Sequence, residues 1–130
     1  MYQTKHIHYK SIFKQDGQTE TIEYKAKGIV HKDKETHICF KSDDMDIQIS
    51  YGENGITLNQ GVSSLRFDYQ KELWNEYQLP YGEVLLKTKL KMFEANDDRF
   101  KMKYELYDQN GMISTVYILI TMIPYSFVED

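Results

Sequence analysis

The stretch FKMKYELYDQNGMISTVYILITMIP, residues 100–124, decides the fold because it reads as two long strands joined by a tight turn. The dipeptide Asn110-Gly111 predicts this turn, since both central residues of a type I′ turn need positive φ angles. In this register Tyr104 faces Tyr117 on one side of the ribbon, because side chains alternate along a strand. The opposite side of the second strand then carries an apolar strip, whose members are Val116, Ile118, Ile120 and Met122.

This apolar strip needs a cover in the folded protein. The N-terminal segment or the segment around Trp74 could lie across it. A homodimer partner that packs on the last strand is the other possibility, since exposed apolar patches tend to be interfaces.

Alternating apolar and polar residues continue through most of the chain. Asp16-Gly17 predicts a hairpin in which Tyr9 faces Tyr24, and Asn54-Gly55 predicts another in which Tyr51 faces Leu58. Further strands are predicted over residues 36–41, 62–69 and 82–93, whereas residues 72–80 could form a strand or one helical turn. About eight to ten short strands without a long helix predict an all-β, antiparallel, up-and-down closed β-barrel, since closure removes exposed edges.

Length and composition limit the class of protein. A chain of 130 residues predicts a single domain over residues 1–130. The net charge of −4 argues against nucleic acid as the main partner. Cys39 is the only cysteine, so no internal disulfide is possible, and no stretch is long and apolar enough for a leader or a membrane span. We therefore expect a soluble, cytoplasmic protein.

The second half of the chain carries short motifs that match a known family. The motifs are an aromatic-Gly-Glu start (Tyr81, Gly82, Glu83), a Leu-Lys-Thr segment (Leu86, Lys87, Thr88) and a tyrosine-bearing strand (Tyr104). With these motifs the chain resembles the YwiB-like proteins, a domain-of-unknown-function family of Gram-positive bacteria. The resemblance implies a lipocalin-like (calycin-type) β-barrel, a fold similar to that of carriers of small apolar molecules. It implies no enzymatic activity and no cofactor.

Tyrosines dominate the predicted interior of the barrel. The inward set comprises Tyr9, Tyr24, Tyr51, Tyr69, Tyr104 and Tyr117. Buried phenols normally find hydrogen-bond partners, so these residues form either a cross-bonded core or a cavity lined with hydroxyl groups. Such a cavity would bind a small apolar or amphipathic molecule, and non-enzymatic binding of this kind is the main functional hypothesis.

Lysines gather on the predicted outer wall. They are Lys87, Lys89, Lys91, Lys101 and Lys103. If the two strands keep their apolar sides together, these five side chains lie next to each other and produce a local positive field. The alternative hypothesis is therefore an interaction module that binds an anionic macromolecule or lipid headgroup through this face, although the lysines could equally solubilise the wall.

Candidate catalytic and metal-binding residues are sparse. His31 and His37 would face each other across the turn at residues 33–35, where an acidic residue could complete a metal site, but spacing fixes no third ligand. His6 and His8 share one face of the first strand, and alternation places all four histidines outside the barrel. No GxSxG, HExxH or CxxC motif occurs. We therefore expect no enzyme active site, no cofactor and no metal.

Overall fold

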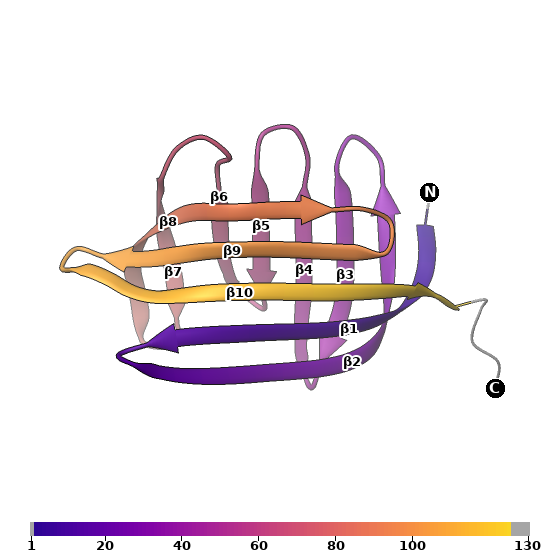
Figure 1. Ribbon diagram of the computed structural model, residues 1–130, viewed down its shortest axis with the longest axis horizontal. Helices are drawn as coiled ribbons and strands as arrows, with labels where there is room; N and C mark the ends of the chain where they lie inside the picture. Colours follow the sequence, from indigo (N-terminus) through magenta and orange to yellow (C-terminus); the bar gives the residue numbers. More distant parts are fainter. Residues whose placement is uncertain (1, 126–130) are drawn as a thin grey trace.

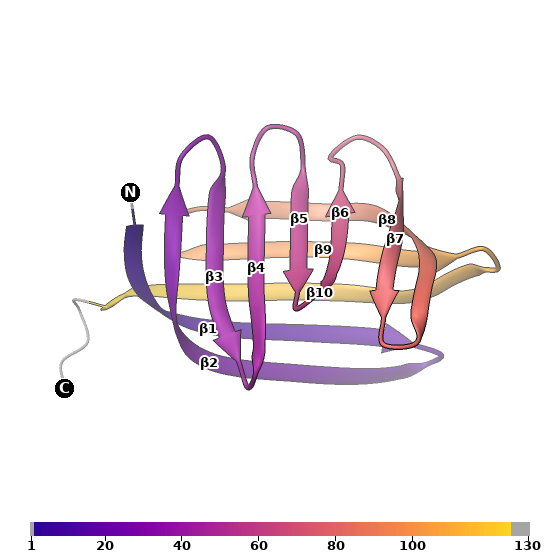
Figure 2. The same ribbon diagram turned by 180° about the vertical axis from the view of Figure 1, so that it is seen from behind.

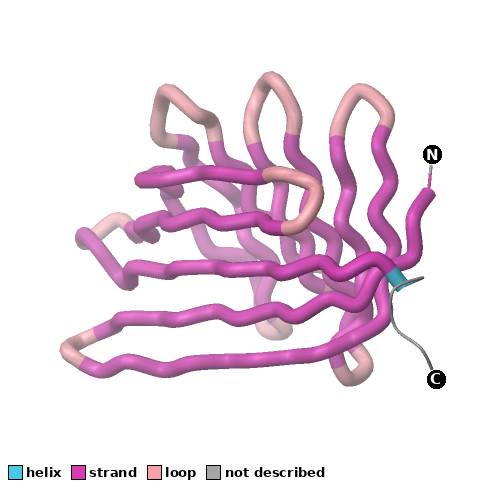
Figure 3. The backbone as a smooth tube through the Cα atoms, turned by 45° about the vertical axis from the view of Figure 1, so that its right-hand side comes forward, coloured by secondary structure: helices cyan, strands magenta, loops and turns pink. Residues whose placement is uncertain are grey.

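The computed structural model describes residues 2–125, and nearly all of them lie in strands (Figure 3). The strands are β1 (Tyr2–Gln15), β2 (Gln18–Lys32), β3 (Thr36–Ser42), β4 (Met45–Tyr51), β5 (Ile56–Gln60), β6 (Ser63–Phe67), β7 (Leu73–Leu79), β8 (Gly82–Ala95), β9 (Arg99–Asp108) and β10 (Gly111–Pro124). The segment that could have been a helical turn is thus strand β7.

The ten strands form one antiparallel sheet in the order β6-β5-β4-β3-β2-β1-β10-β9-β8-β7. The predicted all-β, up-and-down barrel is therefore confirmed. Figure 1 shows that β9, β10 and β1 cross in front of β3–β6, which run steeply behind them. Strands β2 and β8 bend from one layer into the other, and Figure 2 shows both bends from behind. Bending strands shared by two layers are the usual way to build an orthogonal β structure.

Gly28 lies where β2 begins to pair with β3 as well as with β1. A Cβ atom at this position would lie 2.7 Å from the carbonyl oxygen of Cys39 and 2.7 Å from Cγ1 of Ile7. The missing side chain therefore lets three strands approach closely at the bend. The pairing of β2 with β3 runs from Gly28 to Lys32 without a bulge.

The barrel is nearly closed, because within residues 2–125 no backbone ladder joins β6 to β7. Side chains bridge this seam instead. The amide of Asn75 accepts a hydrogen bond from Arg66 N at 2.8 Å and donates to Arg66 O at 3.3 Å. Thr88 Oγ1 donates to the same carbonyl at 2.7 Å, and Ser63 Oγ donates to Gln78 O at 2.6 Å. Closure thus depends on a few polar side chains.

The last hairpin differs from its prediction by its register. Its two-residue loop is Gln109–Asn110, and Ile113 forms a bulge, so Tyr104 pairs with Val116 and not with Tyr117. The apolar strip on β10 consequently faces the interior, where its four members are at most 2% exposed. The prediction that this strip needs a cover, and with it the basis for a dimer through the last strand, was wrong.

The hairpin β4–β5 also has a different register. Tyr51 faces Ile56 and Ile49 faces Leu58, because the connection spans residues 52–55. The predicted pairing of Tyr51 with Leu58 was therefore wrong by two residues, which leaves the inward face unchanged because side chains alternate with a period of two.

Candidate functional site

The two ends of the barrel differ in how they are filled. The turns that follow β1, β3, β5, β7 and β9 lie at one end, as an antiparallel meander requires, and we call this the open end. At the opposite end, Phe93 packs against Tyr51, Tyr69 and Phe100 with ring centroids 5.4–5.6 Å apart. We call this the filled end, because its aromatic rings occupy the interior.

Two adjoining hollows are found at the open end. The larger has a volume of about 490 Å³, and its lining residues include Phe13, Ile22, Tyr24, Ser42, Ile47 and Gln60. The smaller, of about 170 Å³, reaches deeper and is lined by residues that include Ser11, Leu58, Leu65, Tyr77, Tyr104 and Val116. Tyr9, Phe13 and Gln60 line both, so the two hollows meet at these side chains.

Three of the six predicted ligand-binding tyrosines lie at this site. Tyr9 is 3% exposed, and its ring centroid is 6.1 Å from that of Tyr24. Tyr104 is fully inside, where burial, followed by the nearby phenols of Tyr9 and Tyr77, raises its pKa well above the ordinary value. Burial also raises the pKa of Tyr9. The phenols of Tyr9 and Tyr104 therefore stay protonated and can donate hydrogen bonds to a ligand.

The other three predicted tyrosines lie elsewhere. Tyr51 is half-buried at the filled end, whereas Tyr69 is exposed there, and the Tyr69 hydroxyl donates to Gly52 O at 2.6 Å. Tyr117 faces the outside opposite Lys103, because of the bulge in β10. The inward placement of Tyr117 was wrong, and its predicted role at an interior site has no support from its position.

Two serine hydroxyls are buried at the site without a hydrogen-bond partner among the described residues, those of Ser11 and Ser42. Ser42 is 6% exposed and ends β3 beside the larger hollow. Ser11 is 1% exposed and lines the smaller hollow; its hydroxyl lies close enough to Tyr9 to oppose the rise in the pKa of that phenol. Ser11 thus has Tyr9 as a neighbour, whereas the Ser42 hydroxyl has no partner within residues 2–125, and buried polar groups normally have one, so Ser42 needs an explanation.

The charged residues that line the two hollows have one sign. Asp43 and Asp44, in the turn between β3 and β4, line the larger hollow. Within the described part of the chain, no lysine, arginine or histidine lines either hollow. The entrance is therefore acidic.

The predicted lysine face is interrupted by carboxylates. Lys89 faces Glu105 across the strands, and Lys101 faces Glu94. Glu72 lies 3.1 Å from Lys87 Nζ and 3.9 Å from Lys89 Nζ. Lys91 is the bulged residue of β8, and Lys103 faces Met92. The expected row of five neighbouring positive charges was wrong, because the bulge at Lys91 shifts the register and acidic residues alternate with the lysines.

Several residues of the open end were not predicted as site residues. Phe13 and Ser11 were placed on the inward face of the first strand but not at a site, Tyr77 lay in the segment of uncertain structure, and Ser42 carried no signal. The alternation of β1 placed Ser11 inside, since it follows Ile7 and Tyr9 on the same face.

The fold and site define a class of protein, a nearly closed antiparallel β-barrel with two adjoining hollows at its open end. The chain belongs to the family described as Domain of unknown function (DUF1934), whose sequence profile matches residues 7–120. The predicted YwiB-like resemblance is thereby confirmed. The crystal structure of the YwiB protein from Bacillus subtilis is similar in fold, with a TM-score of 0.69, 18% sequence identity and 92% of each chain covered. No curated protein matches significantly.

One further comparison concerns membranes. Among residues 2–125 there is no helix with the length and apolar character that crossing a membrane requires.

Proposed function

We propose that this protein binds a small amphipathic molecule at the open end of its barrel, without catalysing a reaction. The observation that carries the proposal is the orphaned hydroxyl of Ser42, buried beside an otherwise largely apolar hollow. A buried hydroxyl without a partner costs about 1–3 kcal/mol, and a ligand that bonds to it recovers this free energy on binding.

The lining residues suggest how such a ligand lies. Its apolar part would contact Phe13, Ile22 and Ile47, which form the apolar wall of the larger hollow. Its polar group would bond to the Ser42 hydroxyl and to the phenol of Tyr24, near the entrance. Mostly apolar hollows with a few polar groups that fix orientation are typical of small-molecule sites.

The charge of the entrance refines the ligand class. The carboxylates of Asp43 and Asp44 would repel an anionic headgroup, and no cationic side chain among the lining residues would offset this repulsion. We therefore infer a neutral or cationic amphiphile rather than a fatty-acid carboxylate. The calycin-type carriers that the family resemblance suggested are consistent with this inference, since barrels of this size can hold one small ligand.

The location of the protein belongs to the same proposal. Cys39 is a free, partly buried thiol, and burial raises its pKa, which keeps it protonated and unreactive. A free cysteine suits a reducing compartment, so we retain the cytoplasm as the proposed location.

A fluorescence titration tests the proposed site. Trp74 is 51% exposed on the outer wall, so its emission does not report on the interior, and an external probe is needed. We expect the neutral probe N-phenyl-1-naphthylamine to bind saturably at one site and to be displaced by long-chain alcohols and amines. Long-chain carboxylates of equal length should displace it at least tenfold less well.

Variants locate the binding. The substitution Tyr24→Ala should weaken binding of the probe at least fivefold, because it removes part of the wall. The matched control is Tyr69→Ala, which removes a tyrosine from the filled end and should leave the affinity unchanged. Absence of saturable binding, or equal weakening by the two substitutions, would overturn the proposal.

A further inference from the structure

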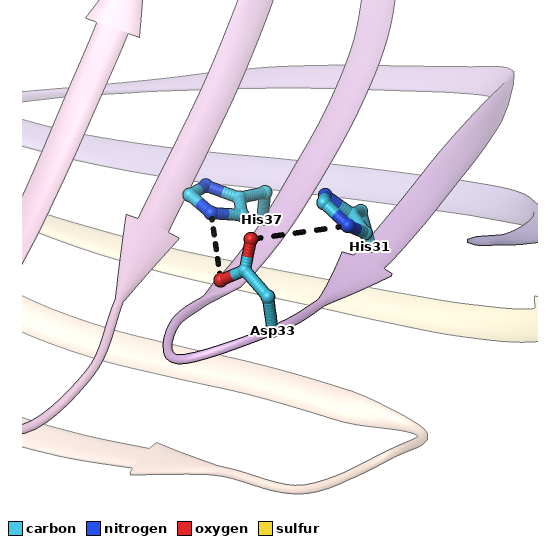
Figure 4. Close-up of side chains that lie close together, drawn as sticks. All are labelled: His31, Asp33 and His37. Atoms are coloured by element: carbon cyan, nitrogen blue, oxygen red, sulfur yellow. Dashed lines mark ion pairs between the residues drawn. The ribbon is translucent and has the colours of Figure 1, made fainter. Parts of the chain in front are cut away.

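A second feature lies at the filled end, in the hairpin between β2 and β3. His31 and His37 face each other across the strands, and Asp33 lies in the turn between them. Figure 4 shows the Asp33 carboxylate placed between the two imidazole rings. Its oxygens are 3.8 Å from His31 Nε2 and 3.7 Å from His37 Nε2, and potential ligand atoms of the three residues lie within 4.8 Å of one another.

The two rings are held in place by neighbours. The Nδ1 atom of His37 lies 2.7 Å from Ser50 Oγ, and a hydrogen bond donated by Nδ1 leaves Nε2 with a free lone pair directed at Asp33. Such a partner on the second nitrogen is typical of histidines that bind metals. His31 is stacked between Tyr2, at a centroid distance of 4.1 Å, and His37, at 5.7 Å.

The carboxylate is also positioned. The backbone N–H of Glu35 donates to Asp33 Oδ1 at 2.9 Å. This hydrogen bond holds the carboxylate in the turn beside the two imidazole rings. The carboxylate is the form of an aspartate side chain that binds a metal ion.

We propose that His31, Asp33 and His37 form a binding site for a divalent transition-metal ion, with Zn²⁺ as its simplest occupant. Ligand bonds of about 2.1 Å in a tetrahedral site place ligand atoms about 3.4 Å apart, so atoms that lie within 4.8 Å of one another need to close by about 1.4 Å at most. Rotations of exposed or half-buried side chains suffice for this change. Because the two hollows lie at the other end of the barrel, the proposal is independent of the proposed ligand.

The donor set determines the class of ion. Two imidazoles and one carboxylate suit Zn²⁺, Cu²⁺ and Ni²⁺, whereas Mg²⁺ and Ca²⁺ prefer sites made of oxygen atoms. Three protein ligands leave at least one coordination position open, and all three residues are accessible to solvent. Water would complete the coordination.

Titration of the untagged protein with Zn²⁺, followed by calorimetry, tests the proposal. We expect one equivalent to bind with a micromolar or lower dissociation constant and to raise the thermal unfolding midpoint. Titration with Co²⁺ gives a second readout, since nitrogen and oxygen ligands in a four-coordinate site produce strong visible absorption. His31→Ala, Asp33→Asn and His37→Ala should each weaken binding of Zn²⁺ at least tenfold.

The chain contains a matched control for these variants. His8 and Glu23 also form a pair of imidazole and carboxylate on the outer face, 2.5 Å apart, but they are not part of a three-ligand cluster among the described residues. His8→Ala should leave the affinity for Zn²⁺ unchanged. Failure of the wild-type protein to bind one equivalent, or equal weakening by His8→Ala and His37→Ala, would overturn the proposal.

Discussion

The side-chain amide of Asn75 bonds to both backbone polar groups of Arg66, accepting from N at 2.8 Å and donating to O at 3.3 Å. Asn75 thereby replaces one rung of the missing ladder between β6 and β7. It is 6% exposed, and its neighbour Thr88, at 1%, adds a second bond to Arg66 O. A strand edge left unpaired would attract other chains, so this seam protects the barrel as well as closing it.

Removal of the Asn75 amide should destabilise the protein. Asn75→Ala leaves the partly buried Arg66 N–H without its partner, which costs about 1–3 kcal/mol in the free energy of unfolding. Urea denaturation measures this loss of unfolding free energy. Hydrogen exchange of the Arg66 amide gives a second readout and should become faster in the variant. Gln78→Ala on the same strand is the control, since that side chain is exposed and its loss should cost about 0.5 kcal/mol or less. Equal losses in the free energy of unfolding for Asn75→Ala and Gln78→Ala would contradict the role of Asn75 in closing the seam.

The close approach of strands at Gly28 predicts that adding one methyl group there strongly lowers the stability of the protein. Gly28→Ala places Cβ 2.7 Å from a backbone oxygen, so strands must separate, and we expect a loss of about 2 kcal/mol or more. At Gly52, an added Cβ meets only the flexible side chain of Glu35 at 2.9 Å, so Gly52→Ala should cost much less. Urea midpoints of the two variants check this order, and a smaller loss at Gly28 would refute the packing argument.

The pair of His8 and Glu23 predicts a dependence on pH. The hydrogen bond from His8 lowers the pKa of Glu23 below its ordinary value, so its contribution to stability is present above that ordinary pKa and lost as the pH falls through the lowered pKa. In His8→Ala the pKa of Glu23 should rise toward its ordinary value, as followed by NMR of the carboxyl group. The pKa of Asp33, which depends on Glu35 first, should not move. An unchanged pKa of Glu23 in His8→Ala would show that the pair of His8 and Glu23 does not form in solution.

The Ser42 hydroxyl should lower the stability of the protein and strengthen ligand binding. Ser42→Ala removes a buried hydroxyl that lacks a partner, so the free energy of unfolding should rise by about 1 kcal/mol, while affinity for long-chain alcohols should fall about fivefold. Ser63→Ala is the contrast, because the Ser63 hydroxyl bonds to Gln78 O across the seam, and its loss should lower stability without affecting binding. Unchanged affinity in Ser42→Ala would remove the main support for the proposed orientation of the ligand.

The comparison of the two long hairpins shows what sequence could predict. Asp16 and Gly17 both have positive φ, as a type I′ turn requires, and Tyr9 faces Tyr24 as predicted. In the last hairpin the pattern did not reveal the bulge at Ile113, because residues 116–122 are apolar at nearly every position and fit either face. Register is therefore predictable only where one face of a strand is clearly polar.

The site was predictable only in part, for related reasons. Tyr9, Tyr24 and Tyr104 were placed inside by alternation, but alternation cannot tell which end of a barrel is filled. That distinction depends on Phe93, which the bulge in β8 turns toward Tyr51 and Tyr69. Alternation also could not identify Asp33 as the third residue of the cluster with His31 and His37, because alternation applies to strands and Asp33 lies in a turn.

The central claim is that the open end of the barrel holds a small amphiphile. Native mass spectrometry of the protein purified from its own host, without detergent, tests it most directly. We predict a bound neutral or cationic molecule of a few hundred daltons that is released on mild denaturation. A protein found at its bare mass in every such preparation would contradict the claim.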